Sequence, residues 1–79
     1  MPRYYFHLEG RGSRLTDEQG ITLPDAEAAW YQAVRSAREA IRADLQLGAC
    51  WRERSVEIRD EGGAPVAQIP LEEIAAYAF

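Results

Sequence analysis

The segment LPDAEAAWYQAVRSAREAIRADLQLG, residues 23–48, carries the clearest periodic pattern in the sequence and decides the fold. Pro24 and Asp25 are typical of a helix start, because an Asp side chain at the N-cap accepts a hydrogen bond from a free backbone N–H. Thr22 offers a competing cap. Gly48 is typical of a helix end, where the left-handed conformation is favoured. The segment therefore predicts one long helix between these two ends.

The predicted helix has one apolar face. At about 100° per residue, its apolar side chains fall within one arc, which we expect to be buried. The members of this arc are Ala26, Trp30, Ala33, Val34, Ala37, Ile41 and Leu45. The alanines allow the helix to approach a sheet closely, and Trp30 supplies most of the bulk. Asp44 falls inside the arc, so either the last turn frays or Asp44 has an Arg partner.

The sequence before the helix predicts a β-hairpin. Residues 3–9 alternate with period two and are rich in aromatic side chains, as in a strand. We expect the side that faces the helix to carry Tyr4, Phe6 and Leu8, and the opposite side to carry Tyr5, His7 and Glu9. The stretch GRGS, residues 10–13, predicts a turn. Residues 14–18 predict the return strand, and residues 21–23 a further extended segment.

The sequence after the helix predicts a second hairpin and a short helix. Residues 54–61 and 65–69 lie on either side of the turn DEGG, and Pro65 is compatible only with the first position of a strand or with an edge strand. The expected inward side chains are Val56 and Ile58, and the expected outward ones are Ser55, Glu57 and Arg59. Residues 71–79 predict a terminal helix with Leu71, Ile74, Ala75 and Ala78 on one side.

These elements predict an α+β fold in a single domain, residues 1–79. Their order is hairpin, long helix, hairpin and short C-terminal helix. We expect an antiparallel sheet of about four strands with the long helix packed on one face. A chain of 79 residues has room for one thin core.

The composition excludes several classes of protein. The formal net charge is −4, unlike the basic profile of a nucleic-acid-binding domain, so we expect no nucleic-acid partner. Cys50 is the only cysteine, which leaves no internal disulfide and no structural zinc site. No apolar run approaches the roughly 18 residues that span a bilayer, and residues 1–20 lack a signal-peptide pattern. We therefore expect a cytoplasmic protein without membrane contact.

The sequence offers little catalytic chemistry. His7 is the only imidazole, and its spacing from Cys50 and from the serines suggests no pairing of a nucleophile with a base. The acidic pairs sit in turns or at a helix start, where acids serve solubility and capping. We expect no catalytic residue, no metal ligand and no cofactor, and hence a protein that is not an enzyme.

Two groups of side chains are candidates for an interaction surface. Tyr5 and His7 fall on the sheet face that the long helix leaves open. They are ordinary half-exposed strand residues, lie under the terminal helix, or form part of a partner or homodimer surface; a catalytic or metal-binding role of His7 is the least favoured alternative. On the outer side of the helix, four side chains fall within about 60° of one another. They are Tyr31, Arg35, Arg38 and Arg42. This basic stripe is either a solvated helix face or a surface for phosphate or an acidic partner. Trp51, Tyr77 and Phe79 add aromatic surface beyond the expected core.

Three quoted segments resemble a family of small uncharacterised bacterial proteins: RYYFHL (3–8), DEQGITLPDAEAA (17–29) and DEGG (60–63). The shared pattern is an aromatic N-terminal strand ending in His or Asp, an acidic–Gly turn, a Leu-x-Asp helix start and a final hairpin. The resemblance covers nearly the whole chain. It implies a compact α+β domain of no known activity, with no catalytic residues to transfer.

A second likeness, over residues 3–45, is to HicB-type antitoxins, which also run from a hairpin near an R-Y-Y stretch into an alanine-rich helix. Only Pro24 and Asp25 of their usual P-D-L-P-G-C segment are kept. This likeness implies a module that binds a small basic protein. The leading hypothesis is a non-enzymatic protein-interaction module that forms a homodimer, because small domains often gain burial by oligomerisation.

Overall fold

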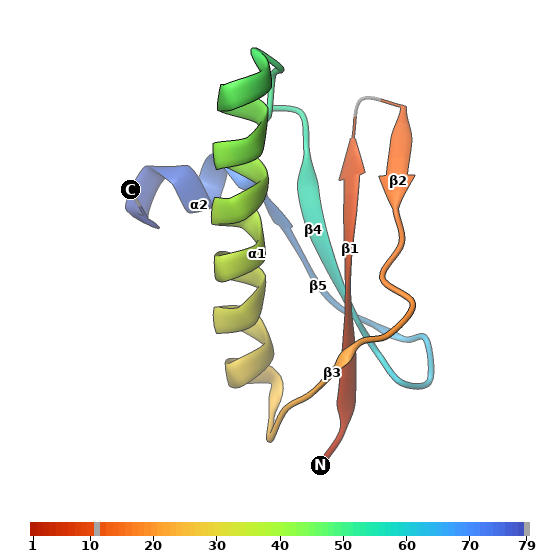
Figure 1. Ribbon diagram of the computed structural model, residues 1–79. Coiled ribbons are helices and arrows are strands. Elements are labelled where there is room, and N and C mark those ends of the chain that lie inside the picture. The colour runs from red at the N-terminus through yellow and green to blue at the C-terminus, as the bar shows by residue number, and fades with distance from the viewer. Residues whose placement is uncertain (11, 79) are drawn as a thin grey trace.

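The computed structural model describes residues 1–10 and 12–78, and its described part forms an antiparallel sheet of five strands with two helices (Figure 1). The strands are β1 (Arg3–Gly10), β2 (Ser13–Leu15), β3 (Ile21–Thr22), β4 (Ser55–Asp60) and β5 (Pro65–Pro70). Their order is β2-β1-β4-β5, and β3 pairs with β1. The predicted α+β class is therefore confirmed. The short β3 is the strand beyond the four expected.

The register of the sheet gathers its apolar side chains on the face toward the helices. Phe6 pairs with Ile58, and Leu8 pairs with Val56 between β1 and β4. Val56 in turn pairs with Ile69 of β5. Because alternate residues of a strand point to opposite faces, this register places one apolar layer against the helices. Tyr4, Val56, Ile58 and Ile69 are buried in that layer, and Phe6 and Leu8 pack against it.

Helix α1 (Ala26–Leu47) begins and ends where the sequence predicts. The Asp25 carboxylate accepts a hydrogen bond of 2.9 Å from the backbone N–H of Ala28, so Asp25 is the N-cap. Thr22, the competing cap, lies in β3. Gly48 ends the helix with a φ of 71°, and its N–H bonds to carbonyls of the last turn.

The buried face of α1 differs in part from the predicted arc. The buried members are Ala29, Ala33, Val34, Ala37, Ile41 and Asp44. Ala26 and Leu45 are exposed, so these two predictions were wrong. Ala26 is the first helical residue, and Leu45 lies in the last turn of α1. Trp30 is half-buried, whereas the largest fully buried side chains are Ile58, Leu71, Ile74 and Val56.

Asp44 is buried because it has an arginine partner. Its carboxylate accepts hydrogen bonds from Arg54, in the loop before β4. The helix continues to Leu47, so of the two interpretations of Asp44 the structure selects the ion pair. A buried carboxylate needs such a partner, since an unpaired charge is costly in the interior.

The second hairpin and helix α2 (Leu71–Ala78) complete the helical side of the molecule. Pro65 occupies the first position of the edge strand β5, as predicted. Leu71 and Ile74 are fully buried. Helix α2 packs on α1 and β5, and α1 packs mainly on β4 and less on β1. The helical layer is therefore offset from β2, which forms the opposite edge of the sheet (Figure 1).

Candidate functional site

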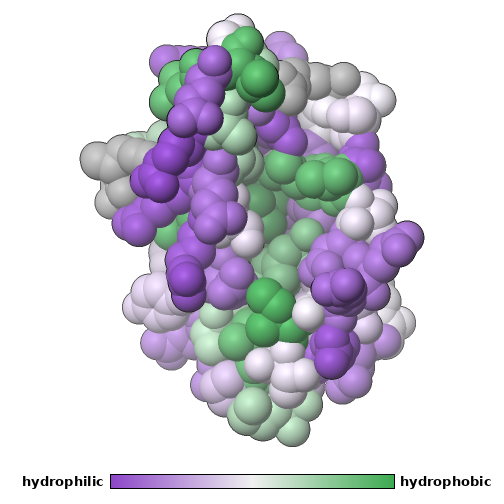
Figure 2. All heavy atoms as spheres, viewed as in Figure 1, coloured by the Kyte–Doolittle hydropathy of each residue, from purple (hydrophilic) through white to green (hydrophobic). Residues whose placement is uncertain are grey.

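An open groove lies between α1 and β2, where the offset helices leave the sheet uncovered. Figure 2 faces this groove and shows apolar side chains at its bottom, between the polar outer face of α1 and the opposite sheet edge. The groove has a volume of about 340 Å³. Exposed apolar surface that is contiguous and rimmed by polar groups is typical of an interaction site.

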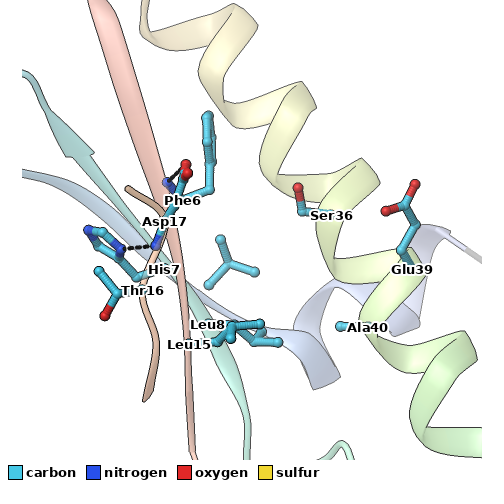
Figure 3. Close-up of a pocket in the computed structure, with 10 residues that line it drawn as sticks. Phe6, His7, Leu8, Leu15, Thr16, Asp17, Ser36, Glu39 and Ala40 are labelled. Carbon is cyan, nitrogen blue, oxygen red and sulfur yellow. Dashed lines mark hydrogen bonds between the residues drawn. The ribbon is translucent and has the colours of Figure 1, made fainter. Parts of the chain in front are cut away.

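The walls of the groove come from three parts of the chain (Figure 3). The strands contribute Phe6, His7, Leu8, Leu15 and Val56, the β2–β3 connection contributes Thr16 and Asp17, and α1 contributes Ser36, Glu39 and Ala40. Leu15 is 68% exposed, although it is a large aliphatic side chain. The α1 wall is low, because Ser36 and Ala40 are small and lie one helical turn apart.

The groove carries acidic groups on both walls. Asp17 lies on the strand side and Glu39 on the helix side, and among residues 1–10 and 12–78 no arginine belongs to the lining. Within residues 1–10 and 12–78, no ion pair involves Glu39, whose side chain is exposed. The two carboxylates give the rim a negative charge.

Asp17 is fixed by filling a gap in the edge of β1. On that edge β3 pairs with β1 as far as Tyr4, and β2 pairs with it from Leu8 onward. Between them the Asp17 carboxylate accepts the N–H of Phe6 at 3.1 Å. Its other oxygen accepts the N–H groups of Gln19 and Gly20, each at 3.1 Å. One side chain thus satisfies three backbone donors that the interrupted strand pairing leaves open.

These hydrogen bonds keep Asp17 charged. Burial alone raises the pKa of this carboxyl, but the N–H groups of Gly20, Phe6 and Gln19, together with His7, outweigh it and hold the pKa below its ordinary value of 3.8. Asp17 is therefore an anion at neutral pH, at the edge of the groove.

His7 is buried, so the expectation of a half-exposed side chain was wrong. Only 7% of its surface is exposed. Its Nδ1 accepts the backbone N–H of Asp17 at 3.0 Å, and Figure 3 shows the ring turned away from α1 beneath the β2–β3 connection. Because Nδ1 is the acceptor, a neutral ring carries its proton on Nε2. Through this hydrogen bond, His7 holds the β2–β3 connection in place at Asp17.

The sheet face away from the helices carries ion pairs, which shield part of it from solvent. Glu57, expected to point outward, is only 8% exposed. It accepts hydrogen bonds from Arg59 at 2.9 Å and from Arg14 at 2.8 Å. The Arg59 hydrogen bonds, opposed by burial and reinforced by Arg14, lower the pKa of Glu57 to about 2. Arg14 also pairs with Glu9.

Tyr5 and Trp51 lie apart from each other. Tyr5 is half-buried on β1, with its ring so near Gly20 that an added Cβ there would lie 2.9 Å from it. Trp51 lies in the loop between α1 and β4, packs against the core, and has the Arg52 guanidinium 5.2 Å from its ring centre. The side chain of Tyr77 and the whole of Phe79 fall outside the described residues.

The basic stripe on α1 does assemble as expected. Tyr31, Arg35, Arg38 and Arg42 are all exposed. The Tyr31 ring packs edge-to-face on Trp30, with the ring centres 5.4 Å apart. None of the four belongs to the groove, whose α1 wall lies on a different side of the helix.

Of the groove residues, sequence reasoning named only His7 as a candidate for an interaction surface. Asp17 has the appearance of an ordinary turn acid, and Ser36, Glu39 and Ala40 that of an ordinary helix flank. The one available signal was the large aliphatic residue Leu15 in the predicted return strand. In the structure Leu15 ends β2, and its side chain is exposed.

Two kinds of feature are absent from the described residues. Residues 1–10 and 12–78 hold no group of three or more His, Cys, Asp or Glu side chains placed to bind a metal ion. Over the same part of the chain, neither helix combines the length and the apolar character that crossing a membrane requires.

Comparison with known proteins identifies a family and no activity. No curated protein and no solved structure gives a significant match. A family model matches residues 3–72, from the start of β1 into α2, and so includes every residue of the groove. The chain belongs to the family described as a domain of unknown function (DUF6894).

Proposed function

We propose that this chain is a protein-interaction module without catalytic chemistry of its own, and that the groove between α1 and β2 is its contact surface. The observation that carries the proposal is the exposure of Leu15 beside the apolar floor formed by Phe6, Leu8 and Val56. A partner that covers this floor would gain roughly 25 cal/mol for each Å² of apolar surface removed from water. The proposal keeps the cytoplasmic location and bacterial origin expected from the sequence.

The absence of a catalytic role is supported by the way the polar groups beside the groove are used. The Nδ1 atom of His7 accepts a backbone N–H, and both oxygens of Asp17 accept backbone N–H groups. General acid–base catalysis requires a titrating group that can reach a substrate proton. These two groups instead hold the β2–β3 connection against β1.

Site-specific photo-crosslinking in the cells that carry the gene tests the contact surface. A benzoyl-phenylalanine placed at Leu15 should give a discrete adduct, and the same probe at Leu45, which is exposed on α1 outside the groove, should not. The added substitution Ser36→Trp should fill the groove and abolish the adduct. An adduct that survives Ser36→Trp, or that forms equally from position 45, would contradict the proposal.

Self-association is a second candidate, supported by the free edge of β2. This strand ends the described sheet, so the backbone groups along its free edge can pair with a second copy and extend the sheet. Such pairing leaves the groove open. Sedimentation at micromolar concentration should then show a dimer, whereas a clean monomer of 8.9 kDa would remove this candidate.

An antitoxin-type role, in which the chain binds a small basic protein, is supported by the acidic rim at Asp17 and Glu39. It predicts that a basic protein co-purifies with the chain and that the complex weakens as salt is raised. Purification from the native host without any basic protein attached would dispose of this role.

A further inference from the structure

We propose that the groove between α1 and β2 binds an amphipathic helix of a partner protein, with aliphatic side chains toward the sheet and lysine or arginine at its flanks. This inference rests on the proposed function and names the chemistry of the partner. It follows from three properties of the groove: its position in the helical layer, its apolar floor and its charge.

The position of the groove is that of a missing helix. Helices α1 and α2 lie side by side over β4, β5 and part of β1, and the layer stops before β2. A further helix at the usual separation of about 8–10 Å from α1 would lie over β1 and β2. The small side chains of Ser36 and Ala40 on that wall permit such a close approach.

The floor of the groove suits the apolar face of a helix. Phe6, Leu8 and Val56 lie at the bottom, and Leu15 forms the outer wall. A volume of about 340 Å³ accommodates large side chains. Helices that dock in such grooves do so through apolar residues at i, i+3 or i+4, and i+7, on one face.

The negative charge of the groove favours basic residues on the flanks of the partner helix. Asp17 is held in its charged form, Glu39 is exposed without an ion pair in the described chain, and Glu18, next to Asp17, is also exposed. Arg35 and Arg42 lie on the outer side of α1 and are not among the lining residues. Basic residues on the partner would therefore meet carboxylates on both walls. A second copy would bring the same acidic rim and a net charge of −4, so charge disfavours it as the occupant.

The experiment uses three synthetic 14-residue peptides with the full chain. The first has leucines on one helical face and lysines on the other, the second replaces lysine by glutamate, and the third scrambles the first so that no apolar face forms. Backbone amide NMR spectra of the labelled protein report where each peptide binds. We expect the leucine–lysine peptide alone to shift the amides of Leu8, Leu15 and Ala40, with an affinity that falls as salt rises.

Two pairs of variants separate charge from apolar contact. Glu39→Lys should weaken binding of the leucine–lysine peptide by about three- to tenfold, since an attraction becomes a repulsion. Glu61→Lys, in the exposed β4–β5 turn, changes the net charge equally and should leave the affinity unchanged. Leu15→Ser should weaken binding at least about fivefold through lost apolar burial. Leu45→Ser, on the exposed side of α1, should have no effect.

The remaining outcomes overturn the inference in distinguishable ways. Equal binding of the glutamate peptide in the groove, or shifts confined to Tyr31, Arg35, Arg38 and Arg42, would show that the acidic rim does not select the partner. Shifts of groove amides with protein concentration alone would show that a second copy occupies the groove. Failure of all three peptides would exclude a helix as the occupant. In each case the crosslinking from position 15 decides separately whether the groove is a contact surface.

Discussion

The Arg54 guanidinium holds the Asp44 carboxylate by two hydrogen bonds of 2.8 Å, one to each oxygen, and so fixes the last turn of α1 to the loop that enters β4. Both side chains are largely buried. Arg54 has two further structural contacts, because its carbonyl accepts the N–H of Leu71 at the start of α2, and its backbone lies close to Gly10 at the end of β1. Four elements of the fold therefore meet at this residue.

Removal of one partner of this pair should be severely destabilising. Arg54→Met removes both hydrogen bonds that this guanidinium makes to the buried Asp44 carboxylate and should lower the free energy of unfolding by about 3 kcal/mol. The double variant Asp44→Leu/Arg54→Met should be less damaging, since the buried negative charge is removed together with Arg54. Urea unfolding followed by tryptophan fluorescence measures both. Arg52→Met is the control, because its ion pair with Glu72 is 3.9 Å long and exposed, and its loss should cost less than about 1 kcal/mol. Equal losses for Arg52→Met and Arg54→Met would contradict this account.

The stability of the fold should survive replacement of His7 by a residue whose side chain places a hydrogen-bond acceptor where Nδ1 now lies. His7→Asn offers its side-chain oxygen to the Asp17 N–H and should retain stability to within about 1 kcal/mol, whereas His7→Leu leaves that N–H unsatisfied and should lose about 1–3 kcal/mol. Amide hydrogen exchange at Asp17 checks the cause, since it should become fast in His7→Leu and stay slow in His7→Asn. If both variants are equally stable, the hydrogen bond is not what holds the β2–β3 connection.

The stability of the protein should fall in acid through Glu57. Its pKa is about 2 in the folded chain, against an ordinary value of 4.5. The unfolded chain therefore binds a proton more readily, so the contribution of Glu57 is fully present above pH 4.5 and is lost as the pH falls toward 2. Glu57→Gln should be less stable than the parent at pH 7 by about 1–2 kcal/mol. This difference in the free energy of unfolding, the gap between the two proteins, should narrow on acidification. A gap that stays constant between pH 5 and pH 2 would show that Glu57 contributes nothing through its charge.

Gly10 should tolerate no side chain. Its φ is +133°, and a Cβ would lie 2.6 Å from the carbonyl oxygen of Glu53 and 2.8 Å from the Cα of Arg54, both of them backbone atoms that cannot turn aside. We expect Gly10→Ala to cost at least about 3 kcal/mol. Gly12 is the matched control, since its φ is +73° but nothing lies within 4 Å of the added Cβ, so Gly12→Ala should cost about 1 kcal/mol from backbone strain alone. Thermal unfolding by circular dichroism compares them, and similar midpoints for the two variants would be the contrary result.

Local patterns in the sequence were reliable where the interaction that they describe is itself local. The cap of α1 at Asp25 and its end at Gly48 involve atoms within one turn of the helix, and both predictions are confirmed. The extended backbone of β1 and the position of Pro65 at the start of β5 are confirmed for the same reason. The predicted arc of α1 was less accurate, because the sheet beneath the helix decides which part of an apolar face is covered.

Periodicity and hydrogen bonds between near neighbours were enough to predict the helices and main strands of this protein, their order and most of the buried face of α1. The tertiary structure alone decided that His7 and Glu57 are buried and that Asp17 completes the edge of β1, because their partners come from strands brought together by the sheet order. The tertiary structure also decided where the groove forms. Two residues of its walls, Leu15 and Ala40, lie far apart in the chain. The distance between the walls depends on how far the helical layer is displaced across the sheet, and no local pattern encodes that displacement.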